Sequence, residues 1–308
     1  MSLPSAPAYT FQEYLNTSRS GRAHLWHWAL GIGLIISLTA LGVFLIANTL
    51  GPHVPYTPFF DYLLLLIIFL PLFCVVFLVH HFWHKRKWLR LITAASRFRW
   101  GYFWRAIGVL LAFFTLVSFA EYIIVPEDYA ELSLQTDWRA YLGFLALTLG
   151  LIPFQAASEE LFCRGYLTQA LGKYIRAPWI IFIITSAIFA GLHAGNPEAA
   201  GQAWPYLISI FGFGLAMSAL LYFEGGIESA IGAHIANNIF VFGFLGYADP
   251  DIPNTALLTL GEPVIGWSDT VLDLILMAVL TGLIILANQR FGRSMPPKNE
   301  NNGVKAVK

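Results

Sequence analysis

Long apolar runs separated by short polar segments dominate this chain. About 20 apolar residues in a helix cross the hydrocarbon core of a bilayer, so each run of that kind is a candidate membrane span. We find eight, over residues 25–48, 60–82, 106–125, 140–160, 178–195, 204–223, 227–247 and 270–289. The pattern predicts an all-α, polytopic membrane protein with about eight transmembrane helices in one bundle.

The composition agrees with a membrane protein. Of the 308 residues, 57% are hydrophobic and 12% are charged, whereas soluble domains carry about 25% charged residues. The two cysteines, Cys74 and Cys163, lie in or beside apolar runs, so we expect no disulfide framework. The first apolar run is long enough to span, and we therefore expect a retained helix rather than a cleaved signal peptide.

The basic residues are distributed unevenly, although the formal net charge is zero. If the chain has eight spans and its N-terminus is cytosolic, every basic residue except Arg139 falls on the cytosolic side. The outer loops then carry acidic residues, namely Glu127, Asp128, Glu131, Asp137, Glu198, Asp249, Asp251 and Glu262. The positive-inside rule therefore predicts that both termini are cytosolic, in the plasma or inner membrane if the source is bacterial.

The same pattern divides the chain into four parts. We expect residues 1–23 to be a polar cytosolic segment with little regular structure. Residues 24–135 would form peripheral transmembrane helices joined by a basic, aromatic loop, 84–105, at the cytosolic interface. Residues 136–250 would form the helical core that carries the chemistry, and residues 251–308 the last transmembrane helix and a cytosolic tail.

Three groups of polar residues interrupt the apolar runs of the predicted core. They are Glu159-Glu160-x-x-x-Arg164, Phe189-x-x-x-His193 and His234-x-x-x-Asn238. Residues four apart share one face of a helix. Ionisable groups inside a membrane are costly and commonly mark a functional site. Small residues flank both histidines, which would let the helices approach closely.

Each group has an ordinary structural interpretation when it is taken alone. Glu160 and Arg164 could be an ion pair at a helix end, His193 an interfacial histidine, and His234 with Asn238 a set of interhelical hydrogen bonds. Together, on three spans of a chain that is poor in buried polar groups, they indicate one site. We expect the other histidines to be interfacial (His24, His27, His53, His80, His81 and His84), and Glu224 and Glu228 to be solvated beside a Gly-Gly turn.

The order of the three motifs resembles the CAAX-processing and bacteriocin-processing intramembrane proteases, the CPBP or Abi family, which includes the type II CAAX prenyl endopeptidase. The resemblance covers roughly residues 140–245. It implies that Glu159 and His193 activate the attacking water, and that His234 and Asn238 stabilise the oxyanion. It further implies that Glu160 and Arg164 fix the position of their helix and of the general base, Glu159. Asn237 lies beside Asn238, and the sequence leaves open which amide faces the site.

The resemblance implies an intramembrane endopeptidase whose partners are the lipid bilayer and a peptide or protein substrate, prenylated or otherwise membrane-associated, with no nucleic acid. We favour a glutamate mechanism without a cofactor. The rival version uses a divalent metal, zinc, bound by Glu159, His193 and His234, although no His-Glu-x-x-His helix is present. Two non-proteolytic alternatives are a proton-coupled transporter, which the lack of an internal repeat disfavours, and a non-catalytic membrane immunity or partner protein.

One geometric conflict accompanies this hypothesis. At a rise of about 1.5 Å per residue, Glu159 lies about 29 Å along its span, near the cytosolic side. His193 lies about 22 Å along the next span, toward the outer side. A kink at Pro153, or continuation of the helix through the apolar run Leu161–Leu167, would bring the two side chains to one depth.

Overall fold

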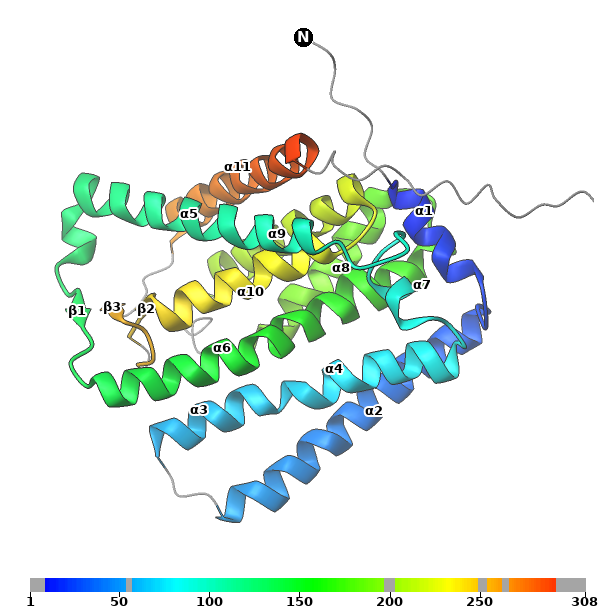
Figure 1. The fold of residues 1–308 in the computed structure, drawn as a ribbon, viewed down its shortest axis with the longest axis horizontal. Coiled ribbons are helices and arrows are strands. Elements are labelled where there is room, and N and C mark those ends of the chain that lie inside the picture. Colours follow the sequence, from blue (N-terminus) through cyan, green and yellow to red (C-terminus); the bar gives the residue numbers. More distant parts are fainter. Residues whose placement is uncertain (1–8, 54–56, 197–202, 249–253, 262–265, 292–308) are drawn as a thin grey trace, which may run out of the picture.

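Helices make up most of the described structure (Figure 1). A computed structural model describes residues 9–53, 57–196, 203–248, 254–261 and 266–291. The helices are α1 (Phe11–Asn16), α2 (Leu25–Leu50), α3 (Pro58–Ile67), α4 (Phe69–Leu78), α5 (Trp100–Ile124), α6 (Trp138–Glu160), α7 (Thr168–Gly172), α8 (Pro178–Leu192), α9 (Ala203–Glu224), α10 (Glu228–Gly243) and α11 (Trp267–Phe291). Wider π-helical turns, Val79–Trp83 and Leu161–Leu167, extend α4 and α6.

All eight predicted spans form helices, and six helical segments of the described chain are long and apolar enough to cross a membrane. The protein is thus an integral, multi-pass membrane protein. The other two predicted spans are shorter, since α8 has 15 residues and α10 has 16. Both fall below the roughly 20 residues of a full crossing, so the count of eight stays a prediction.

Helix α10 occupies the interior of the bundle, where it packs against α5, α6 and α9 (Figure 1). Gly232 makes one of these contacts possible, because a Cβ at this position would lie 2.5 Å from the Phe103 carbonyl oxygen of α5. The grouping of residues 24–135 as peripheral helices stays a prediction. Within it, α5 packs against α10, whereas α2, α3 and α4 lie along the α6 edge of the bundle.

The described chain also contains a small sheet. Its strands are β1 (Ser133–Leu134), β2 (Leu245–Tyr247) and β3 (Leu258–Leu260), in the order β1-β3-β2. β3 pairs antiparallel with β1 and parallel with β2. Strands of two and three residues are too short to show an alternating hydrophobic pattern, which is why the sequence did not predict them.

The described part of the N-terminal segment is ordered, contrary to expectation. Thr10 and Glu13 form a capping box that starts α1. The side chains of Phe11 and Tyr14 are buried, and the Tyr14 hydroxyl donates to the Leu91 carbonyl at 2.7 Å. The segment was expected to be irregular because it is polar, but a helix as short as α1 has too few residues to show a helical period in the sequence.

The 84–105 segment enters the end of the bundle instead of lying only at the interface. Leu91 is fully buried, and Thr93 forms a β-bridge with Gly226. Two predictions about neighbouring polar groups are therefore wrong. Glu224 and Glu228 are buried: Glu228 pairs with Arg99 at 2.6 Å. His80 and His84 are also fully buried, and His27 is buried as well.

Candidate active site

The three sequence motifs meet between α6, α8 and α10. The Nε2 atom of His234 lies 3.6 Å from Oε2 of Glu159, and Nε2 of His193 lies 4.0 Å from the same oxygen. Glu159 is 8% exposed and His234 is 3% exposed, whereas the His193 side chain retains 18%. Two imidazoles therefore converge on one carboxylate oxygen inside the bundle.

The depth conflict disappears because the helix does not end at Glu160. It continues through the π-helical turn and α7, which gives a single segment, Trp138–Gly172, of 35 residues. Glu159 thus lies in the interior of this segment, while His193 lies at the C-terminal end of the short helix α8. Of the two explanations the sequence offered, continuation through Leu161–Leu167 is the one observed.

Glu160 and Arg164 form a fully buried ion pair that also holds a histidine. Arg164 Nη1 donates to Glu160 Oε1 at 3.1 Å, and His234 Nδ1 donates to the same oxygen at 2.9 Å. The guanidinium lies 4.4 Å from the ring centroid of Phe189. Gly214 of α9 makes room for it, since a Cβ there would lie 2.9 Å from Arg164 Nη2. The pair thus anchors α6 to α10, α8 and α9.

In each histidine, the hydrogen bond made by Nδ1 determines whether Nε2 can donate or accept a proton. His193 Nδ1 donates to the Phe189 carbonyl at 2.8 Å, and His234 Nδ1 donates to Glu160. With Nδ1 as the donor, Nε2 of a neutral ring carries a lone pair and donates only when the ring is protonated. Both Nε2 atoms are directed at Glu159, where each can accept a proton or, as an imidazolium, give one.

A chain of three amides ends on the other oxygen of Glu159. Asn237 Nδ2 donates to Asn238 Oδ1 at 2.9 Å, Asn238 Nδ2 to Gln155 Oε1 at 2.7 Å, and Gln155 Nε2 to Glu159 Oε1 at 2.7 Å. Hydrogen bonds that run in one direction polarise one another. Asn238, not Asn237, contacts Gln155, which answers the question that the sequence left open.

Gln155 is a residue of this site that the sequence analysis did not select. It lies four residues before Glu159, and therefore on the same face of α6. Its spacing was a usable signal, but a lone glutamine in an apolar run carries no charge and belongs to none of the three motifs. Gln155 binds Oε1, whereas the Oε2 atom of Glu159 is buried and has no hydrogen-bond partner in the described structure.

The residues proposed as zinc ligands do not form a metal site in this arrangement. Among the described residues, no group of three or more His, Cys, Asp or Glu side chains is placed to hold a metal ion. We therefore derive no chemical step through a metal, and the zinc version stays a hypothesis for chelation experiments.

Comparison with known proteins identifies the segment that contains this site. Residues 140–240 match the family model described as type II CAAX prenyl endopeptidase Rce1-like. The resemblance predicted from the three motifs is confirmed, since this segment is similar to the Rce1-like family. At the family level, this match supports a CAAX-type intramembrane protease, and so a membrane hydrolase that takes a peptide substrate.

A second similarity covers most of the chain. The uncharacterized protein YyaK of Bacillus subtilis (strain 168) is 29% identical over 265 residues, which cover 79% of this chain and 87% of YyaK. No solved structure matches the chain. The similarity to YyaK extends beyond the 140–240 segment, so that protein also resembles at least part of the N-terminal half described here.

Proposed function

We propose that this protein is an intramembrane endopeptidase in which Glu159 activates a water molecule for peptide-bond hydrolysis. The observation that carries the proposal is the state of Glu159. One carboxylate oxygen accepts a hydrogen bond from Gln155, and the other faces the Nε2 atoms of His193 and His234 with no hydrogen-bond partner among the described residues. A general base needs a free lone pair within reach of the proton that it removes.

The reaction begins with a water molecule that donates one proton to Glu159 Oε2 while its oxygen attacks the scissile carbonyl carbon. The carbonyl oxygen becomes an oxyanion. It takes hydrogen bonds from the second Nδ2 hydrogen of Asn238 and from protonated His234, because preorganised donors are strongest in a water-poor site. Glu159 then returns its proton to the leaving nitrogen, with His193 able to share it, and the C–N bond breaks. The products are a carboxylic acid and an amine, which become a carboxylate and an ammonium group when the acid proton passes to the amine.

The proposed substrate is a peptide near the C-terminus of a membrane-associated protein, and the prenylated form is the one that the family points to. The site would be reached from the cytosol. The asymmetry of basic residues supports that orientation, since 84–105 and both terminal segments carry most of the Lys and Arg residues.

Cleavage of a defined peptide by purified protein tests this proposal. Protein in mild detergent is incubated with a farnesylated C-terminal peptide and, separately, with the same peptide lacking the lipid, and the products are identified by mass spectrometry. We expect one cut, with the lipidated peptide preferred. Cleavage of both peptides at equal rates would reject the prenyl preference, and cleavage of neither would reject this substrate class.

The same assay separates the glutamate mechanism from the zinc hypothesis. We expect cleavage to persist after treatment with a strong chelator. Loss of cleavage on chelation, followed by recovery when zinc is added back, would overturn the metal-free mechanism.

A further inference from the structure

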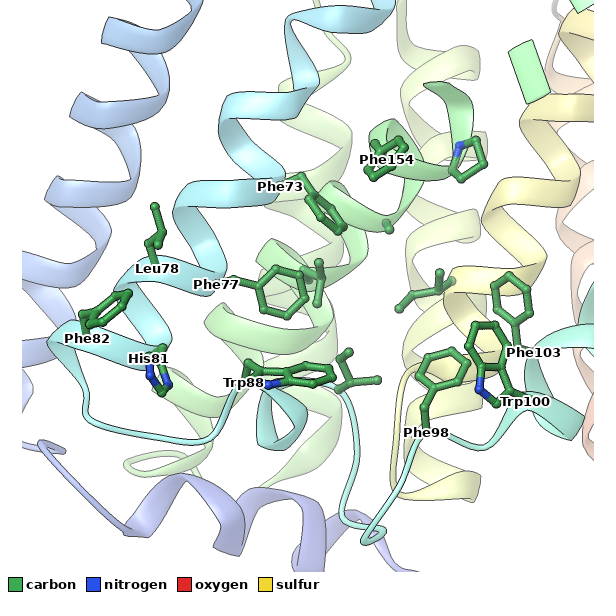
Figure 2. A pocket seen from close by; sticks show the side chains of 15 residues that line it. Phe73, Phe77, Leu78, His81, Phe82, Trp88, Phe98, Trp100, Phe103 and Phe154 are labelled. Carbon is green, nitrogen blue, oxygen red and sulfur yellow. The ribbon is translucent and has the colours of Figure 1, made fainter. Parts of the chain in front are cut away.

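The structure contains an apolar groove that the catalytic residues do not use. It has a volume of about 550 Å³ and is lined by residues of α4, α5, α6, α10 and the 84–105 segment. Figure 2 shows its long form: Phe73 and Phe154 lie at one end, and Trp88, Phe98 and Trp100 lie at the other. Its volume falls within the roughly 300–1,000 Å³ typical of ligand pockets.

The groove opens toward the lipid along its length. Trp88 is 57% exposed and Trp100 is 60% exposed at one end, and Phe154 is 39% exposed at the other. Tryptophans gather at the membrane–water interface. The end with Trp88 and Trp100 therefore lies near the headgroups, while the Phe154 end lies deeper in the hydrocarbon. An extended hydrocarbon chain that enters from the bilayer would fit this direction.

The groove is separated from the candidate active site by the helix that carries Glu159. Ala157 and Leu161 form part of its wall, and each lies two residues from Glu159, a rotation of about 200° around the helix. Neither catalytic histidine lines the groove. A chain bound here would lie behind the catalytic turn, and for this reason we do not assign the groove to the lipid group of the substrate.

The segment that supplies the interfacial end of the groove is basic. The 84–105 segment contains seven basic residues and no acidic residue. Lys85 and Lys87 are exposed and come just before Trp88 in the sequence, and neither forms a salt bridge within the described structure. Arg86, between them, is buried and donates hydrogen bonds to the Ser18 and Ser20 carbonyls. It therefore holds the N-terminal segment in place and is not available to a lipid headgroup.

We propose that this groove binds one acyl chain of an anionic phospholipid whose phosphate group is held by Lys85 and Lys87. The apolar lining accounts for the chain, and the lysine pair at the tryptophan-lined end accounts for the negative headgroup. The proposal does not depend on the proteolytic function, because no residue of the catalytic machinery contributes to the groove.

Native mass spectrometry of the full-length protein tests the headgroup contact. Phosphatidylglycerol and phosphatidylcholine with identical acyl chains are titrated into protein in mild detergent. A lysine near anionic lipid strengthens binding by about fivefold, so the Lys85→Gln/Lys87→Gln double variant should bind phosphatidylglycerol about 25-fold more weakly. Binding of phosphatidylcholine should not change. Lys305→Gln/Lys308→Gln is the matched control, which removes the same charge from the C-terminal tail.

A second pair of variants tests the acyl-chain contact. Ala157→Leu adds volume to the groove wall, so it should weaken both lipids. The control is Ala112→Leu, an exposed position on α5 away from the groove, and it should change neither. Thermal unfolding checks that each variant is folded. Three results would overturn the proposal. The first is equal affinity of the wild-type protein for the two lipids, and the second is unchanged phosphatidylglycerol binding in the lysine variant. The third is displacement of bound phosphatidylglycerol by a farnesylated peptide.

Discussion

Glu159 and Glu160 are neighbours in the sequence, but they have different surroundings. Glu160 is fully buried and accepts hydrogen bonds from Arg164 and His234 on one oxygen. Glu159 has an oxygen that is free to accept a proton. This difference predicts different consequences when each carboxylate is replaced: removal of Glu160 should affect the fold, and removal of Glu159 should affect only the chemistry.

Arg164→Ala should destabilise the protein as well as inactivate it. The substitution leaves Glu160 as a buried charge without its cation, and breaking a buried ion pair in this way costs about 3–5 kcal/mol. Thermal unfolding in detergent measures the effect, with exposed Arg139→Ala as the control. An Arg164→Ala protein with the wild-type melting temperature would show that the pair does not hold the helices together.

Gln155→Leu should lower kcat with little change in KM. Leucine has about the same volume as glutamine, but it cannot donate a hydrogen bond to Glu159 or accept one from Asn238. A hydrogen bond to a charged group contributes about 1.5–3 kcal/mol, which predicts a loss of about 10- to 100-fold. Thr148→Val is the control, because it removes a buried hydroxyl of the same helix that bonds Tyr62 instead. Wild-type kcat in Gln155→Leu would contradict the positioning role.

At the scale of elements, the N-terminal segment and the 84–105 segment pack together at one end of the bundle. His84 joins them to the extension of α6, since its Nδ1 donates to the Arg22 carbonyl at 2.7 Å and its Nε2 lies 2.7 Å from the Tyr166 hydroxyl. Burial lowers the pKa of His84 to about 4, and the nearby Arg86 cation acts in the same direction.

This lowered pKa predicts that stability falls in mild acid. An unfolded histidine has a pKa of about 6.5, so between pH 6.5 and pH 4 the unfolded chain binds a proton that the folded chain excludes. The melting temperature should therefore decrease as pH falls from 7 to 5. His84→Gln, which cannot titrate, should show a smaller decrease, and an identical pH dependence in the variant would mean that another group is responsible.

Whole elements were predictable from the sequence because apolar runs of this length have one stable form in a bilayer. The polar motifs were equally visible, since Glu159, His193 and His234 are conspicuous in apolar surroundings. Contacts between distant segments were not visible. Arg99 and Glu228 are 129 residues apart, and nothing in either local pattern indicates that they pair. Gln155 was missed because its role depends on Asn238 of another helix.

At the scale of the whole molecule, the uneven charge predicts one orientation in the membrane. Single cysteines at Ser96 and at Glu127, in a background without Cys74 and Cys163, should respond oppositely to a membrane-impermeant reagent added outside intact cells. Both positions are exposed in the structure. We expect labelling at position 127 and none at position 96 until the membrane is permeabilised. The reverse pattern would invert the orientation and place the 84–105 segment outside.

The central claim is that Glu159 is the base for an attacking water, and the cleavage rate of Glu159→Gln tests it most directly. This substitution preserves shape and hydrogen bonding to Gln155 but removes the basic oxygen. General-base catalysis contributes about 10²–10⁴ in rate. The variant should therefore cleave the farnesylated peptide at least about 100-fold more slowly, with a wild-type melting temperature. Cleavage by folded Glu159→Gln at the wild-type rate would contradict the account.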